Sequence, residues 1–505
     1  MHAASVGGIA RGPRNLAHVP TPTPGHPPRG AYNLAMTDRP GPSTRVERDS
    51  MGEMEVPADA LYGASTQRAV LNFPISGQHF PRRFIRALAL IKLAAAETNA
   101  ELGLLDGDVA AAIAASAGAV ATGFHDDQFP IDIYQTGSGT STNTNMNEVI
   151  AHLAGERLGG RKVHPNDHVN RCQSSNDVIP SALQLAAAMA IEDALVPGLE
   201  RLHTALVAKE REFWPIVKTG RTHLQDATPI RLGQEFRGYA GQLEESLRRA
   251  RAAQAELLAV PLGGTAVGTG INAHPEYAFR ACARLSSLTG LTVREAANHF
   301  HAQATLDVPI AAHGAVRTIA LSLWKIASDI RLMGMGPRAG LGELALPETQ
   351  PGSSIMPGKV NPVIVESLTM VVARVVGNDA TIAFGQTGSF LELNVMLPVA
   401  TAALLESIDL LAASATNFSA RCIEGLEATD RGPQLVERGL MLATALAPMI
   451  GYDEAAKLAK DALKSGRTIR ELALERGLDA AELDRALDPA SMTEPGLGTS
   501  GGGGG

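Results

Sequence analysis

Polar segments rich in Gly, Ser, Thr and Asn carry the residues of this chain that could bind an anion or transfer a proton. Their sequences are QTGSGTSTN at residues 135–143, GRTHLQD at residues 220–226 and PGSSIMPGKVNP at residues 351–362. A further polar segment, residues 164–177, precedes a long predicted helix. Loops at helix ends commonly hold functional groups, so we expect the site residues in these segments.

The segment 351–362 contains the groups needed to stabilise a carboxylate. Lys359 supplies a cation, Asn361 supplies an amide, and the loop adds serine hydroxyls and backbone N–H groups. Pro362 opens a predicted helix, whose N-terminal dipole favours an anion. These groups suit a carboxylate that gains charge in a transition state. Ser353 could act as a base where Lys359 and the loop N–H groups stabilise its alkoxide, whereas a serine-rich loop without such neighbours is more simply a solvated turn.

The same segment does not fit a Walker A nucleotide loop. One residue more than that loop allows separates Gly352 from Gly358, and Val360 follows the lysine where Ser or Thr is required. The glycines at residues 137–139 and 264–270 lack the βαβ surroundings of a dinucleotide-binding fingerprint. A nucleotide site is therefore disfavoured.

His223 is the candidate acid of the second polar segment. It follows Thr222 and lies between Arg221 and Asp226. A lone histidine is more often structural than catalytic, and a histidine acting as a general acid needs an orienting carboxylate. Glu366, on the first turns of the helix predicted after Pro362, is one candidate for that carboxylate.

Long alanine- and leucine-rich stretches must position these loops. Within residues 181–212, leucines recur at alternating steps of four and three, at Leu195, Leu199, Leu202 and Leu206, which predicts a bundle seam. Pro197 is expected to kink this helix. Further helices are predicted at about 84–121, 231–258, 303–334, 362–384 and 397–421. Because β-branched alternation is scarce, the predicted fold class is all-α, with a central bundle of long helices.

The composition narrows the functional classes. The 505 residues are 45% apolar, 4% aromatic and 19% charged, with a net charge of −8, which argues against bulk nucleic-acid binding. No uninterrupted apolar run reaches the length of a membrane span. The 3 cysteines, Cys172, Cys282 and Cys422, lie far apart without CxxC spacing, so we expect reduced thiols in a cytoplasmic protein rather than a zinc site or disulfides.

The chain is expected to begin and end in tails. Residues 1–45 are rich in Pro, Gly and Arg and are predicted to be disordered, with Met36 as a possible true initiator and an acid-poor transit peptide as the alternative. Residues 494–505 are predicted to form a flexible Gly-rich end. Between the tails we expect an N-terminal domain at 46–173, a helical-bundle domain at 174–430 and a small C-terminal helical domain at 431–493.

The run GSSIMPGKVNP at residues 352–362 resembles the signature of the fumarase/aspartase superfamily. Similar stretches occur at residues 52–68, 125–139, 164–170, 220–229 and 262–272, so the resemblance extends from about residue 46 to about residue 493. It is closest to the metal-independent class II fumarases. Aspartate ammonia-lyases are the alternative, but they typically carry Gln where this chain has His223 and a different run at residues 263–265. The run SFLELN at residues 389–394 and the pair Arg171-Cys172 depart from the usual fumarase pattern.

The resemblance implies a three-domain all-α fold and reversible hydration of fumarate to L-malate. Ser353 would remove the C3 proton, Lys359, Asn361 and loop N–H groups would stabilise the aci-carboxylate, and His223, charged through Glu366, would be the acid. The implied substrate-binding residues are Ser138, Gly139, Thr140, Ser174, Ser175, Asn176, Thr222, Ser354, Lys359, Val360 and Asn361. A second dicarboxylate site would comprise Arg161, His164, Pro165, Asn166 and Asp167, although such residues before a helix also form an ordinary capped turn.

The resemblance also implies the assembly and excludes a cofactor. Family members are homotetramers whose active sites draw loops from several subunits, so we expect a homotetramer that binds fumarate and L-malate. We expect no metal, cofactor, nucleic acid or membrane partner. A non-catalytic protein that keeps this fold is disfavoured, because Ser353, Lys359, Asn361 and His223 are all present.

Overall fold

The computed structural model describes residues 43–495. Most of the predicted tails at 1–45 and 494–505, and the proposed initiator Met36, lie outside these residues. The first described element is a hairpin in which β1 (Thr44–Asp49) pairs antiparallel with β2 (Gly52–Pro57). Helices dominate the rest of residues 43–495, and each sheet there has two short strands. The predicted all-α class is confirmed.

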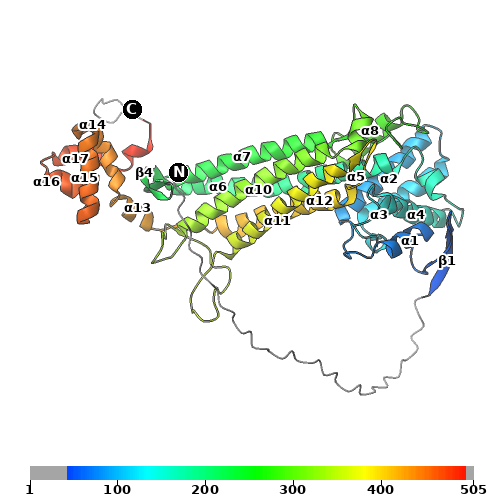
Figure 1. Cartoon of the computed structure of the whole chain (residues 1–505), viewed down its shortest axis with the longest axis horizontal. Coiled ribbons are helices and arrows are strands. Elements are labelled where there is room, and N and C mark those ends of the chain that lie inside the picture. Colours follow the sequence, from blue (N-terminus) through cyan, green and yellow to red (C-terminus); the bar gives the residue numbers. More distant parts are fainter. Residues whose placement is uncertain (1–42, 496–505) are drawn as a thin grey trace, which may run out of the picture. The chain divides into compact units, whose positions relative to one another are not determined.

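A bundle of long helices forms the centre of the fold (Figure 1). Its members pack along their lengths because their buried faces are rich in Leu, Ile, Val and Ala, whose small or branched side chains allow close approach. They are α5 (Ser175–Ala190), α6 (Val196–Phe213), α7 (Leu232–Leu257), α10 (Asp307–Met333), α11 (Val363–Gly385) and α12 (Leu397–Phe418).

The predicted leucine seam is confirmed. Leu195, Leu199, Leu202 and Leu206 are each fully buried. α5 and α6 form one helical run of 39 residues, joined by a π-helical turn at Ile191–Leu195. Pro197 falls in the first turn of α6, where the wider turn before it accommodates the missing N–H.

Two of the bundle's helical runs, Ser175–Phe213 and Leu397–Ile423, are long and apolar enough to span a membrane by length and composition. In their most apolar windows, 83% and 61% of the residues are buried inside the fold. Their apolar character is thus used against neighbouring helices of the same chain.

The helix predicted over residues 84–121 is in fact two helices. α2 (Arg82–Glu101) ends before Gly103, which takes the left-handed conformation, and α3 (Gly107–Thr122) begins after Asp106. The prediction was wrong because the apolar periodicity on both sides of the turn is alike, although the chain reverses between them. α2 and α3 pack on each other, and α1 (Ala64–Asn72) and α4 (Thr140–Arg157) complete this part of the fold.

Shorter elements connect the long helices. The strand pairs are β3 (Val217–Thr222) with β4 (Gln225–Arg231), β5 (Ala259–Val260) with β6 (Arg294–Glu295), β7 (Leu344–Ala345) with β10 (Glu427–Ala428), and β8 (Ser389–Phe390) with β9 (Leu393–Asn394). The connecting helices are α8 (Tyr277–Thr289) and α9 (His299–Ala304).

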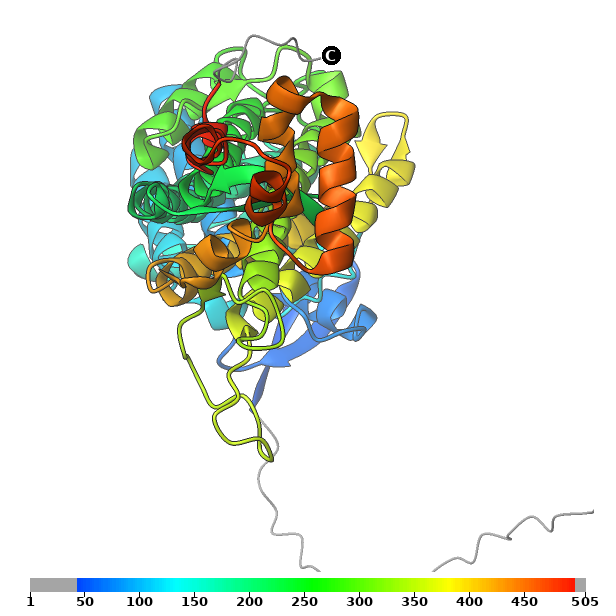
Figure 2. The same cartoon turned by 90° about the vertical axis from the view of Figure 1, so that its left-hand side faces the viewer.

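The C-terminal helices have a hydrophobic cluster of their own (Figures 1 and 2, orange to red). It includes Leu446, Leu458 and Leu483, all fully buried. The helices are α13 (Arg431–Val436), α14 (Ala447–Ile450), α15 (Tyr452–Ser465), α16 (Ile469–Glu475) and α17 (Ala480–Ala486). α13 packs on β3, so this region lies against the hairpin that carries His223. The domain boundaries at 173/174 and 430/431 stay predictions.

Candidate active site

Hydroxyl groups gather where α4 and α5 begin. The Ser138 and Thr140 hydroxyls lie 2.8 Å apart, with Gly139 as the N-cap of α4. Gly139 has a φ of 71°, and a Cβ there would lie 2.8 Å from Ile179 of α5, so only glycine fits. Ser174 caps α5 and accepts a hydrogen bond from the Asn176 N–H.

A buried amide network ties these two helix starts together. Asn143 Nδ2 donates to Ser175 Oγ at 3.2 Å and to Asn170 Oδ1 at 3.3 Å. The predicted residues 138–140 and 174–176, which are distant in sequence, are therefore brought together in one chain. Two helix N-termini and several hydroxyls at one place form a suitable seat for a carboxylate.

A fully buried lysine underlies the same network. Lys92 of α2 donates to Asn170 Oδ1 at 2.9 Å and to Gln173 Oε1 at 3.0 Å. Burial lowers its pKa from 10.5 to about 7, opposed by the negative charge of Asp177. Sequence reasoning missed Lys92 because nothing in the local helix pattern distinguishes a buried lysine from an exposed one.

Asp177 joins the glycine-rich segment 262–272 to this site. Its Oδ1 accepts from the Ser174 N–H at 2.8 Å, and its Oδ2 accepts from Gly263 N–H at 2.9 Å and Thr265 N–H at 3.1 Å. Burial raises the pKa of Asp177, although these N–H donors and Lys92 oppose the shift. The Ser174–Asp177 capping box was visible in the sequence as Ser followed three residues later by an acid.

His223 lies at the tip of the β3–β4 hairpin. Thr222 pairs with Gln225, and the intervening His223 and Leu224 have φ values of 56° and 59°. Two positive φ angles define a type I′ turn, which normally selects Asn and Gly. All of residues 222–226 are exposed. The backbone conformation thus presents the imidazole outward from the chain.

The loop at 351–361 closes on itself. Ser353 Oγ accepts from the backbone N–H groups of Ile355 and Met356 at 3.3 and 3.0 Å, and Asn361 Nδ2 donates to the Gly352 carbonyl at 2.7 Å. These N–H groups are the kind of donor that would stabilise a serine alkoxide. Lys359 is exposed, and Glu366 lies in the first turn of α11.

The structure keeps these groups apart within one chain. α5 and α6 together span about 58 Å, at a rise of about 1.5 Å per residue. Ser174 precedes that run, and the hairpin with Thr222 and His223 follows it at the opposite end of the bundle (Figure 1). The Ser353 loop precedes α11, which is about 34 Å long and ends at Gly385. Among residues 43–495, no hydrogen bond joins His223 to Glu366 or to Ser353.

The residues predicted for a second dicarboxylate site lie together as a capped turn. His164 Nδ1 accepts from the N–H groups of Asn166 and Asp167, capping a π-helical turn at Pro165–Val169. Arg161 is paired with Asp106 and Asp108. A cavity of about 470 Å³ beside them is lined by Arg161, His164 and Pro165, and both basic and acidic side chains complete its polar lining: Arg45, Arg48, Lys162, Glu47, Glu148 and Glu156.

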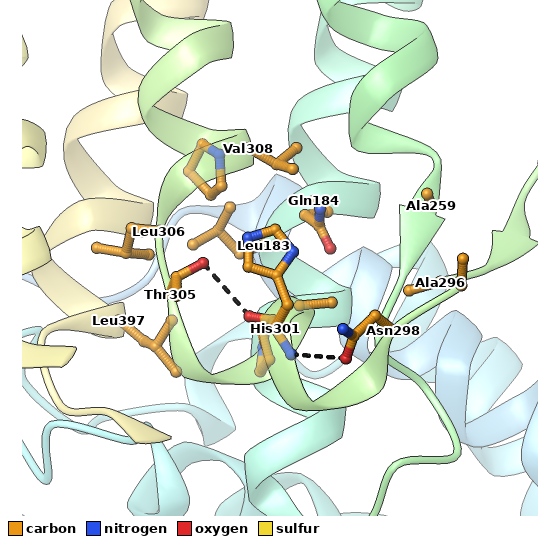
Figure 3. Close-up of a pocket in the computed structure, with 14 residues that line it drawn as sticks. Leu183, Gln184, Ala259, Ala296, Asn298, His301, Thr305, Leu306, Val308 and Leu397 are labelled. Carbon is orange, nitrogen blue, oxygen red and sulfur yellow. Dashed lines mark hydrogen bonds between the residues drawn. The ribbon is translucent and has the colours of Figure 1, made fainter. Parts of the chain in front are cut away.

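A separate cavity of about 220 Å³ lies between α5, α9 and α10 (Figure 3). Leu183, Leu306 and Val308 give it a mainly apolar lining. His301 at its edge lies 2.7 Å from Asp307, and its backbone N–H donates to Asn298. The predicted site residues do not line this cavity, so it is distinct from the candidate active site.

Comparison with known proteins identifies the class first. The sequence model of the lyase family matches residues 52–377, and that of the fumarase C C-terminus matches residues 442–494. The crystal structure of class II fumarase from Schistosoma mansoni superposes with a TM-score of 0.87 at 38% identity, covering 89% of this chain and 99% of that one. The helical bundle and its polar loops are therefore those of a lyase of the fumarase kind.

Curated relatives define the family within that class. The chain is 52% identical to "Fumarate hydratase class II" of Methylorubrum extorquens, over 91% of this chain and 98% of that protein. It is 54% identical to the protein of the same name from Halobacterium salinarum, over 90% of this chain and 98% of that protein. The chain belongs to the class II fumarate hydratase family, as the sequence resemblance predicted.

Proposed function

We propose that the protein catalyses the reversible hydration of fumarate to L-malate, in the cytoplasm and without a metal or other cofactor. The observation that carries this proposal is 52% identity to a class II fumarate hydratase over 98% of its length, combined with His223 beside Thr222. The alternative, aspartate ammonia-lyase, is disfavoured at His223, where that family typically carries Gln.

Ser353 is the proposed base. In the dehydration direction its alkoxide takes the proton from C3 of malate, and the electron pair moves onto the adjacent carboxylate to give an aci-carboxylate. Lys359, Asn361 and the backbone at Val360 stabilise that added charge. The hydrogen bonds from Ile355 and Met356 N–H to Ser353 Oγ support this role, because they favour the anionic oxygen.

His223 is the proposed acid. It gives a proton to the departing C2 hydroxyl, directly or through a water, and the electron pair of the aci-carboxylate forms the double bond of fumarate. Glu366 holds the imidazole in its charged form. Because His223 and Glu366 do not meet within one chain, this pairing requires that they come from different subunits.

The substrate carboxylates are held by hydroxyls, amides and helix N-termini. The proposed ligands are Ser138, Gly139, Thr140, Ser174, Ser175, Asn176, Thr222 and Ser354. Asn143 orients Ser175, and the N-termini of α4 and α5 supply partial positive charge, which supports a dianion at this point. Arg161, His164, Pro165, Asn166 and Asp167 are the proposed second dicarboxylate site.

A homotetramer completes the site in this proposal. The bundle's length separates the carboxylate seat from the proposed acid and base, so a complete site needs other subunits. Exposed apolar side chains along α10 and α11 support an interface there, including Trp324, Met370 and Phe384.

The test is a direct assay with fumarate, L-malate and aspartate in parallel, each with EDTA present. The expected result is hydration of fumarate, measured as a loss of its ultraviolet absorbance. Ammonia-dependent turnover with no hydration would assign the chain to aspartate ammonia-lyase instead. A size measurement in solution checks the tetramer independently of activity.

A further inference from the structure

A buried cluster of four charged side chains lies at the base of the hairpin that carries His223. Lys218 Nζ lies 2.8 Å from Glu235 Oε1 and 3.2 Å from Glu343 Oε2. Arg221 donates from its two terminal nitrogens to the two oxygens of Glu343, at 2.8 and 3.1 Å. The exposed fractions of the Lys218 and Glu343 side chains are only 2% and 1%. Two cations and two anions therefore balance in a nearly dry environment.

Stability alone does not explain this cluster. Burying four charges costs desolvation energy, and well-packed apolar side chains of similar volume are often as stabilising or more so. What the cluster provides is fixed geometry, since a bidentate Arg–carboxylate pair sets orientation as well as distance. Arg221, one member of the cluster, is two residues before the proposed acid His223, where geometry is expected to matter most.

Glu343 is itself fixed by its backbone. Its N–H donates to the Met333 carbonyl at 2.8 Å, and its carbonyl accepts from the Thr429 N–H at 3.0 Å. The next residues form β7, which pairs with β10. The carboxylate is thus anchored to the end of α10 and to the segment that enters the C-terminal helices.

Within one chain, little holds the hairpin beyond Arg221. Residues 222–226 are exposed, and Arg221 is the last largely buried side chain before the turn. The strand also bulges at Gly220, where a Cβ would lie 2.5 Å from the Thr228 carbonyl. His223 and Leu224 then adopt positive φ angles that non-glycine residues rarely keep without support.

We infer that Glu343 is a positioning residue for His223, which it orients by clamping Arg221 at the base of the turn. This inference rests on the proposed function of His223 as the acid. Glu343 does not touch substrate in this role. It fixes the strand from which the turn projects, so its loss lets the imidazole move away from the productive position.

The test compares Glu343→Gln with the matched control Glu235→Gln. Each replaces one buried carboxylate that contacts Lys218, but only Glu343 holds Arg221. We expect Glu343→Gln to lower kcat about 10–100-fold with little change in KM for fumarate. The decrease in log kcat for Glu235→Gln should be less than about a third of that for Glu343→Gln, because the Arg221 clamp remains. Equal kcat losses in the two variants would overturn the inference.

A double-mutant cycle separates positioning from general damage. In a His223→Asn background, Glu343→Gln should cause little further loss of kcat, because the group it positions is already gone. A full additional 10-fold or greater loss would show that Glu343 acts elsewhere. If Glu343→Gln does not fold, Arg221→Lys decides, since it keeps the charge but loses the bidentate fork. Wild-type kcat in folded Arg221→Lys would overturn the inference.

Hydrogen exchange provides a readout that does not depend on activity. Backbone amides of residues 222–226 should exchange faster in Glu343→Gln than in Glu235→Gln, while those of α7 stay equal. Unchanged exchange at the turn would overturn the inference even if the enzyme is active. If the wild-type protein does not hydrate fumarate but exchange at the turn is faster in Glu343→Gln, the clamp is supported and the proposed function is rejected.

Discussion

The two ends of the helical bundle present their functional groups in different ways. At one end, Ser138 and Ser175 lie beside helix N-termini, and Asn143 ties Ser175 to Asn170, which also accepts from the buried Lys92. At the other end, His223 and Lys359 lie on an exposed turn and an exposed loop. Contacts within one chain fix the functional groups of the first end. At the second end such contacts fix only the base of the hairpin and of the loop, and the groups at their tips are exposed.

This difference matches the two tasks in the proposed reaction. Holding a dianion requires fixed donors and a desolvated environment, which one chain can build. In the proposed tetramer, the acid and the base have to reach a seat that belongs to another subunit, which is consistent with their positions on loops. Local rigidity then has to come from anchors such as Asn361 to Gly352 and Arg221 to Glu343.

The largest effect is expected at the exposed end, from Ser353→Ala. Removal of the proposed base should lower kcat about 10²–10⁴-fold while dicarboxylate binding is kept. Steady-state kinetics and calorimetric titration with a non-reacting dicarboxylate check both parts. Ser354→Ala is the control, for which we expect a higher KM and a smaller loss of kcat. Retained turnover in Ser353→Ala would remove Ser353 from the role of base.

The next prediction tests whether the two ends act in different chains. Ser353→Ala and Ser175→Ala impair opposite ends, and we expect mixed oligomers to be more active than either parent. Random assembly leaves roughly a quarter of the sites with both wild-type residues if the two come from different subunits. The measurement is activity after subunit exchange. Activity equal to the mean of the two parents would mean that one chain supplies both residues.

A smaller effect, on stability, is expected from Lys92 at the end of the bundle that holds the carboxylate seat. Because burial lowers the pKa of Lys92 to about 7, the folded protein binds fewer protons than the unfolded chain between about pH 7 and pH 10.5. The free energy of unfolding should therefore rise with pH across this range, by at most about 1.4 kcal/mol per pH unit from this group. Lys92→Met should flatten that rise in urea unfolding at several pH values.

The exposed Lys464→Met is the control for this measurement. It should leave the pH dependence of unfolding as in the wild type. Parallel pH profiles for wild type and Lys92→Met would contradict a lowered pKa for Lys92.

The smallest effect is expected from the cysteines, all three of which are buried. Burial raises the pKa of Cys282 and of Cys422 to about 12, and it raises that of Cys172 as well. The thiolates are the reactive form, so the native protein should resist thiol reagents at pH 8. Colorimetric titration should detect the 3 thiols only after unfolding. Rapid labelling of the native protein would contradict this expectation.

Much of the fold could be predicted because its pattern is local. The leucines of α6 recur on one face, so the seam follows from the spacing alone. The turn at Gly103 was missed because a reversal between two apolar helices leaves the composition unchanged. The π-helical turn before Pro197 depends on how α5 and α6 pack, which no local pattern states.

By itself the sequence determined the all-α class, the family, and the chemical groups available in each loop, because all of these depend on residue type and short spacing. Only the tertiary structure decided which groups meet. It joined α4 to Ser175 through Asn143, buried Lys92 beneath Asn170, and clamped Arg221 to Glu343. It also placed His223 a bundle's length from Ser174. Distances between segments far apart in the chain follow from helix packing and helix length, and these are properties of the folded whole.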